Sequence, residues 1–125
     1  MNIEQVEIKL IVEQINNFIQ KNFWFDFSVD SYINDRLTIT GGLSLSYPPM
    51  IEIYFSEVLF TLVHTTWHTD TSKSVITLLE GEEAKIINRM FGIEVGYQVF
   101  RFAPEDCPNE LGYLVAAKKI TYKIN

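Results

Sequence analysis

The chain has 125 residues, of which 47% are hydrophobic and 14% aromatic, and its 10 basic and 16 acidic residues give a net charge of −6. This length and composition predict a single folded domain over residues 1–125 and exclude a disordered segment. The acidic balance argues against a phosphate-binding surface, and the absence of a long apolar run argues against a membrane-spanning helix. We therefore expect neither a nucleic-acid partner nor a membrane partner.

Residues 3–20 are predicted to form an amphipathic helix. Large apolar side chains recur there every three or four positions, as they do on one face of a helix. They are Ile8, Ile11, Val12, Ile15, Phe18 and Ile19. Asn2 suits the N-cap position, and Glu4 suits the positive end of the helix dipole.

The apolar period then changes from that of a helix to that of a strand. In residues 23–33 the odd positions are mostly apolar, beginning with Phe23, Phe25 and Phe27, and the even positions are mostly polar. This alternation predicts a strand with one buried and one exposed face.

The later elements are predicted from alternation and from turn residues. They are strands at 37–47, 51–55, 74–79, 94–102 and 112–124, and a second helix at 82–91 that Gly92 ends. Gly41–Gly42 within the first of these strands predicts a bulge or a sharp bend. Ser56–Glu57 is compatible with a hairpin turn or with a kink into the apolar stretch that follows.

Strands joined mainly by hairpins, with two helices beside them, predict an α+β domain. We expect a strongly curved, mostly antiparallel sheet of about six or seven strands, with the N-terminal helix and the second helix packed on its apolar face. The opposite face should present Ser, Thr, Asp, Glu and aromatic hydroxyl groups to water.

The stretch HTTWHTD, residues 64–70, contains the only two histidines of the chain, His64 and His68. On a helix they would converge on one metal ion, but the surrounding threonines favour a strand. On a strand they would lie about 13 Å apart, too far to share a zinc ion. We therefore predict a strand end that runs into a polar loop, and we expect no metal and no cofactor. A turn that brings in Asp70 as a third ligand is the alternative.

The single cysteine, Cys107, cannot form a disulfide within the chain, which favours a reducing cytoplasm. It lies between Asp106 and Pro108. Neighbouring carboxylates oppose formation of the nucleophilic thiolate, so we assign no catalytic residue here.

Negative charge is concentrated in the first part of the chain. Residues 1–70 contain nine acidic and three basic residues, whereas residues 71–125 contain seven of each. A basic protein is electrostatically the easier partner for such a chain. Solubility alone is the other explanation, since charge asymmetry is a weak signal.

The polar sides of the predicted strands combine three aromatic with three acidic residues. They are Trp24, Tyr32 and Tyr54, with Asp26, Asp30 and Glu52. Aromatic anchors in acidic surroundings are typical of a surface that binds a basic protein. We therefore predict a non-catalytic protein-binding domain; the alternative is that Trp24 and Tyr32 are covered and belong to the core.

In its acidity and predicted architecture the chain resembles the small acidic α+β proteins that neutralise bacterial toxins. This resemblance implies an immunity-type role and a basic protein as the partner. It rests on charge and fold class, and no motif of the sequence contributes to it.

The second hypothesis is a small-ligand-binding protein or an enzyme. Its pocket would lie between the curved sheet and the first helix. The residues expected around it are His64, Trp67, His68, Arg101 and Tyr113. A homodimer formed through an uncovered sheet edge is a further prediction.

Overall fold

The computed structural model describes residues 3–44, 48–105 and 111–125. In chain order its elements are α1 (Ile3–Ile19), β1 (Phe25–Ile33), β2 (Arg36–Gly42), β3 (Ile51–Leu62), β4 (Thr66–Thr69), β5 (Ile76–Leu78), α2 (Gly81–Phe91), β6 (Gln98–Phe102) and β7 (Tyr113–Ile124). All the strands belong to one sheet, in the order β4-β1-β2-β3-β7-β6-β5.

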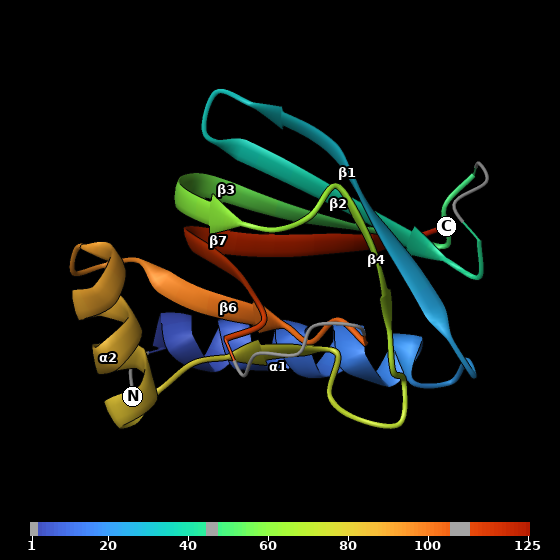
Figure 1. Ribbon diagram of the computed structural model, residues 1–125, viewed down its shortest axis with the longest axis horizontal. Helices are drawn as coiled ribbons and strands as arrows, with labels where there is room; N and C mark the ends of the chain where they lie inside the picture. Colours follow the sequence, from blue (N-terminus) through green and yellow to red (C-terminus); the bar gives the residue numbers. More distant parts are fainter. Residues whose placement is uncertain (1–2, 45–47, 106–110) are drawn as a thin grey trace.

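Neighbouring strands of the sheet are antiparallel throughout, and the sheet curls into a half-barrel. α1 runs along its concave side, and α2 lies at one end (Figure 1). The predicted α+β class, the curved antiparallel sheet and the N-terminal helix are therefore confirmed. No helix in the described ranges is both long and apolar enough to cross a membrane.

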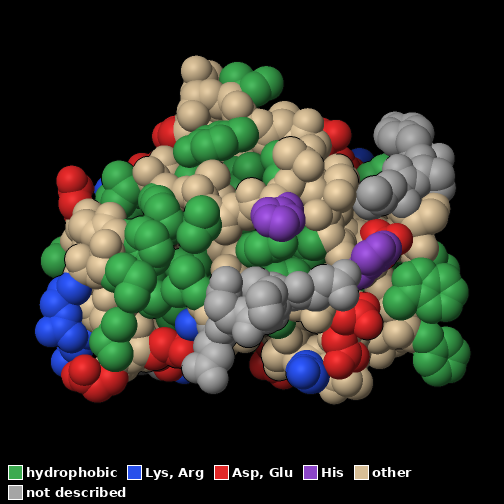
Figure 2. All heavy atoms as spheres, viewed as in Figure 1, with side chains coloured by type: hydrophobic (Ala, Val, Ile, Leu, Met, Phe, Trp, Pro, Cys, Tyr) green, Lys and Arg blue, Asp and Glu red, His purple; other side chains and the backbone are tan. Residues whose placement is uncertain are grey.

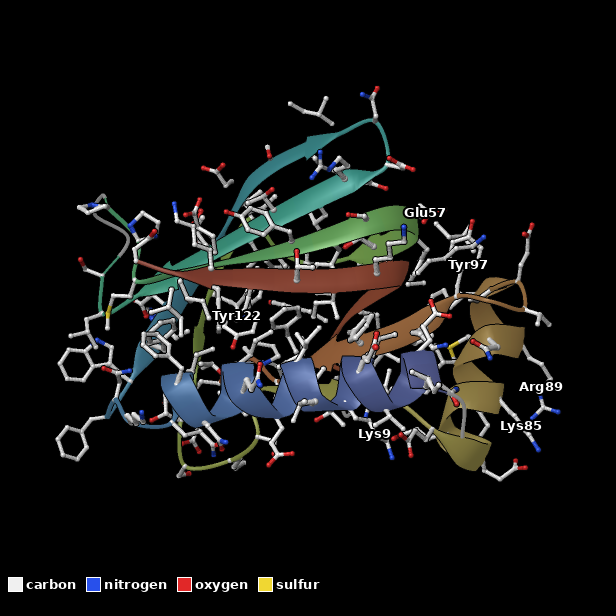
Figure 3. The ribbon with its side chains drawn as sticks, turned by 180° about the vertical axis from the view of Figure 1, so that it is seen from behind. Lys9, Glu57, Lys85, Arg89, Tyr97 and Tyr122 are labelled. Atoms are coloured by element: carbon white, nitrogen blue, oxygen red, sulfur yellow. The ribbon has the colours of Figure 1, made fainter. Side chains whose placement is uncertain are left out.

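α1 and the concave side of the sheet enclose the main hydrophobic core. The helix contributes Ile8, Val12, Ile15 and Ile19, which recur at helical spacing. The largest fully buried side chains of the strands are Phe25, Phe27, Phe55, Phe100 and Phe102. Tyr122 of β7 points toward α1 (Figure 3), and its hydroxyl donates to Oε1 of Gln14 at 2.8 Å.

α2 packs on a second, smaller hydrophobic cluster. Ile87 belongs to this cluster together with Leu114 and Ala116 of β7, which alternate along the strand with the main-core residues Val115 and Ala117. Since successive side chains of a strand point to opposite faces, α2 lies on the side of β7 opposite α1. The expectation that both helices pack on one face of the sheet is corrected in this respect.

Gly41 allows two phenylalanine rings to pack directly on the backbone of β2. A Cβ atom at this position would lie 2.5 Å from the ring of Phe25 and 2.9 Å from the ring of Phe27. β2 ends at Gly42, earlier than predicted. Residues 45–47 of the predicted strand lie outside the described residues.

Glu57 marks a kink within β3. The strand is continuous over 12 residues, so Ser56–Glu57 is not a hairpin turn. Glu57 has a φ of 53°, in the left-handed region, and the register with β7 shifts shortly afterwards, between Val58 and Phe60. Such an irregularity bends a strand and increases its twist.

Both edge strands of the sheet are partly covered. On β5, the side chain of Asn16 accepts from the N–H of Ile76 at 3.1 Å and donates to its carbonyl at 2.8 Å. On β4, Thr69 forms a β-bridge with Pro104. A homodimer formed through a sheet edge requires an edge strand with unpaired backbone groups, and it stays a prediction.

Candidate functional site

The face of β1, β2 and β3 that points away from α1 is polar. Its residues alternate with the main-core residues and pair across the sheet, Ser28 with Thr40 and Thr40 with Glu52. This surface, called the outer face below, comprises Ser28, Ser31, Thr38, Thr40, Glu52 and Tyr54. α1 packs on the opposite side and α2 packs against β6 and β7, so the described helices leave the outer face open.

Three of the residues predicted to bind a partner lie together on this face. The hydroxyl of Tyr54 forms a hydrogen bond with the side chain of Glu52, and Asp30 lies near enough to act on it electrostatically. Partial burial raises the pKa of the Tyr54 hydroxyl, and the negative charges of Glu52 and Asp30 raise it further. Tyr54 is therefore a protonated, hydrogen-bonding group throughout the physiological pH range.

Tyr32 lies on the other face of the sheet. The β1–β2 register shifts just before Ser31, so that Ser31 pairs with Thr38 and Tyr32 pairs with the buried Leu37. Because a shift of one residue exchanges the two faces of a strand, Tyr32 points to the concave side, unlike Tyr54. It is 47% exposed there. The prediction that Tyr32 shares the outer face is wrong.

Trp24 lies at the end of β1, directly before the strand begins. It is 53% exposed, and its Nε1 donates to the carbonyl oxygen of Leu43 at 2.7 Å. Phe23 beside it is 97% exposed, although the alternation placed it on the buried face, because β1 begins only at Phe25. Phe23, Trp24 and the exposed Leu43 form an apolar surface that we call the aromatic corner.

Lysines of β7 offset part of the acidic charge. Nζ of Lys123 lies 4.0 Å from Glu52, and Nζ of Lys119 lies 3.5 Å from Glu57. In the folded protein, basic side chains from the second half of the sequence therefore neutralise part of the acidic charge of the first half. The ion pairs of the described residues do not include Asp30, so the acidic charge of this surface is greatest on the β1 side.

A cavity of about 210 Å³ lies beside β4. It is lined by Asp26, His64, Thr66, Trp67, His68, Pro104 and Tyr113. This cavity, called the Trp67 pocket below, gathers four of the five residues expected around a pocket. It lies where β4 meets the ends of β6 and β7, and not between the sheet and α1, where the main core packs. Thr66, Pro104 and Asp26 were not expected in it.

Arg101 is the expected pocket residue that lies elsewhere. Its Nη1 is 2.8 Å from Oε2 of Glu83 in α2, and its Nε donates to the carbonyl of Leu111 at 3.0 Å. These contacts place its guanidinium on the side of β6 that faces α2. An open groove of about 490 Å³ between α1 and β5 contains none of the expected residues.

Asp26 connects the Trp67 pocket with the surface predicted to bind a partner. It lines the pocket, is 8% exposed, and forms a hydrogen bond with Nδ1 of His68. It is therefore less accessible to a partner than predicted, and its carboxylate is held in place by the neighbouring strand.

Aromatic rings form the remaining walls of the Trp67 pocket. The ring of Tyr113 lies between those of His64, at 4.8 Å, and Trp67, at 5.2 Å. Trp67 is buried, and its Nε1 has no hydrogen-bond partner among the described residues. Figure 2 shows both histidines of the chain on one face of the molecule, with hydrophobic side chains around them.

The prediction for HTTWHTD is confirmed in its local structure. Thr66–Thr69 forms β4, and a polar turn follows in which Asp70 accepts hydrogen bonds from Ser72. Within the described ranges, no group of three His, Cys, Asp or Glu side chains is placed to hold a metal ion. Cys107 lies outside the described residues.

Comparison of the chain with protein-family models, curated proteins and solved structures finds no match in any of the three. Three surfaces of the chain itself are therefore the candidate functional sites. These are the aromatic corner, the outer face and the Trp67 pocket.

Proposed function

We propose that the protein is a non-catalytic binding domain that docks a basic protein through the aromatic corner and the adjoining outer face. The observation that supports this most is the exposure of two adjacent large aromatic side chains. Phe23 is 97% and Trp24 is 53% exposed. Aromatic side chains dominate the binding energy of protein interfaces, and adjacent exposed ones mark an interaction site.

The aromatic corner is preorganised for docking. The hydrogen bond from Nε1 of Trp24 to Leu43 fixes the indole before any partner arrives. Less conformational entropy is then lost on binding, because the anchor side chain is already ordered. The partner gains its apolar contacts mainly from Phe23 and the exposed part of the Trp24 ring.

Electrostatics define the partner's chemistry. Asp30 and Glu52 lie on the same side of the sheet as Tyr54, and Asp30 is in none of the ion pairs that the described residues form. Basic side chains of the partner contact this side of the outer face and steer the encounter. The specific role that we propose is immunity-type neutralisation of a basic toxin in the cytoplasm, in keeping with the net charge of −6 and the single cysteine.

The test is capture of the partner from native extract on immobilised protein, at low and at moderate salt. One basic protein should be retained at low salt and released as salt rises, since screening weakens surface charge pairs. The double variant Phe23→Ser with Trp24→Ser should no longer capture this protein. The control variant Val95→Ser, which alters another fully exposed apolar residue, should capture it as the unaltered protein does. Equal capture by the double variant would overturn the proposed surface.

A further inference from the structure

The second half of β1 has an edge that no described strand covers. β4 pairs only with residues 25–28 of β1, and the last backbone hydrogen bond on that side runs from the N–H of Val29 to the carbonyl of Thr65, at 2.8 Å. β1 continues to Ile33, and its end extends past β4 with only β2 beside it (Figure 1). Residues 30–33 therefore form a free strand edge, called the open edge of β1 below.

The backbone of Tyr32 points outward along this edge. Met50, just before β3, donates to the carbonyl of Gly41 at 2.8 Å, so the backbone groups of Gly41 point to β3. This direction alternates along β2, so Arg36 bonds toward β1, where it pairs with Ile33. The same alternation along β1 turns the N–H and the carbonyl of Tyr32 away from β2. An added strand would find one donor and one acceptor there.

Exposed apolar side chains lie on both faces of the open edge. Tyr32 is 47% exposed on the concave side, and Ile33, the next residue along the strand, is 66% exposed on the outer side. A strand added at this edge would cover part of both. Backbone hydrogen bonds give such an added strand its affinity, and alternate side chains give it specificity.

Charge defines which strand fits. Asp30 is exposed, is in none of the ion pairs of the described residues, and lies close enough to Tyr54 to raise the pKa of its hydroxyl. A basic side chain beside Asp30 on the outer face is favourable, because opposite charges on neighbouring strands attract. A second copy of this chain fits less well. Antiparallel pairing about Tyr32 would place Asp30 of one copy beside the turn that contains Asp35 of the other.

We propose that the open edge of β1 binds an extended basic segment of the partner as an additional antiparallel strand. Basic side chains of the segment lie beside Asp30 on the outer face, and apolar side chains lie beside Tyr32 on the concave side. The apolar residue opposite Tyr32 exchanges backbone hydrogen bonds with it. This inference rests on the proposed function, since it specifies how a basic partner is held at the end of β1 away from the aromatic corner.

An acetylated and amidated peptide of sequence KVKVKVK serves as the probe. In proton–nitrogen correlation spectra of the isotope-labelled protein, it should shift the backbone N–H signal of Tyr32 saturably, with a Kd on the order of millimolar. The same peptide N-methylated at each valine keeps the charge and lacks the donors that meet Tyr32, so it should bind at least about tenfold more weakly. The peptide EVEVEVE should also bind at least about tenfold more weakly, because it places carboxylates beside Asp30.

Two substitutions of Tyr32 separate its backbone from its ring. Tyr32→Pro removes the outward N–H and keeps the bonds of β1 with β2, since proline is tolerated where the N–H of an edge strand faces solvent. It should weaken KVKVKVK binding, followed through the N–H of Ile33, at least about tenfold. Tyr32→Ala is the matched control and should weaken it only about two- to threefold. If Tyr32→Pro does not fold, the N-methylated peptide makes the same test on the unaltered protein.

The double variant Phe23→Ser with Trp24→Ser separates this inference from docking at the aromatic corner. It should bind KVKVKVK as the unaltered protein does, so a failure of the aromatic corner to capture a partner leaves the peptide result intact. The inference is overturned if KVKVKVK does not shift the Tyr32 signal, or if the N-methylated or the acidic peptide binds equally well. A Tyr32 signal that moves with protein concentration alone would show a second copy at the open edge and would also overturn it.

Discussion

Asp26 of β1 and His68 of β4 form a side-chain hydrogen bond between residues 42 positions apart in the chain. Asp26 is buried, whereas the side chain of His68 is 63% exposed. The pair holds the edge strand β4 against β1 and fixes the carboxylate that lines the Trp67 pocket. Since Trp24 lies two residues before Asp26, the same pair supports the strand that presents the aromatic corner.

Asp26→Ala should therefore destabilise the fold. The change removes the hydrogen bond between the buried carboxylate and His68. We expect the free energy of unfolding in urea to fall by about 1–2 kcal/mol, less than for a fully buried pair because His68 is largely exposed to water. Asp35→Ala, at an exposed turn position, should change it by less than about 0.5 kcal/mol. Equal effects of the two changes would show that the pair contributes nothing.

Asn16→Ala should have a larger effect. The buried amide of Asn16 accepts from the N–H groups of Val75 and Ile76 and donates to the carbonyl of Ile76. Its loss leaves these backbone groups beside β5 without partners, at a cost of about 2–4 kcal/mol in unfolding free energy. Asn17→Ala, at the exposed neighbouring position, is the matched control and should remain within about 0.5 kcal/mol of the unaltered protein.

Gly41→Ala tests the close packing of β2. The added methyl group would lie 2.5 Å from the ring of Phe25, so the ring must move. We expect the free energy of unfolding to fall by about 1–3 kcal/mol, which thermal unfolding would show as a lower Tm. At Gly42 the nearest atom to an added Cβ is 3.4 Å away, so Gly42→Ala should be tolerated better. A larger decrease in Tm for Gly42→Ala than for Gly41→Ala would contradict the close packing of the two phenylalanine rings on Gly41.

Asp30→Lys tests the electrostatic part of the docking model. Asp30 is exposed and lies on the β1 side of the outer face, so the reversal should slow association with a basic partner and reduce its dependence on salt. Glu94→Lys makes the same charge change at an exposed position after α2 and should have a smaller effect. Stopped-flow association at several salt concentrations distinguishes them. Identical association rates in the two variants would mean that net charge, and not the position of Asp30, determines the association rate.

Local patterns predicted the elements of the fold well. The spacing of Ile8, Val12, Ile15 and Ile19 identified the buried face of α1, and alternation identified Phe25 and Phe27 as core residues. These assignments succeed because one face of each element is buried and the period of the backbone then fixes which residues lie on it.

The alternation pattern does not predict the structure where the regular period is interrupted. The register shift in β1 moved Tyr32 to the concave side, and the late start of the strand left Phe23 in solvent. Neither feature has a clear local signal, since no glycine or proline stands at either place. The contacts of Tyr113 with His64 and of Arg101 with Glu83 depend on strand order, which alternation does not determine.

Docking of a basic protein by the aromatic corner can be measured by calorimetric titration of the captured partner. The double variant Phe23→Ser with Trp24→Ser should bind at least about a hundredfold more weakly, since two interface anchors are lost together. Val95→Ser should bind as the unaltered protein does, and all three proteins should share one Tm. A Kd for the double variant within about threefold of that of the unaltered protein, with its fold intact, would contradict the claim.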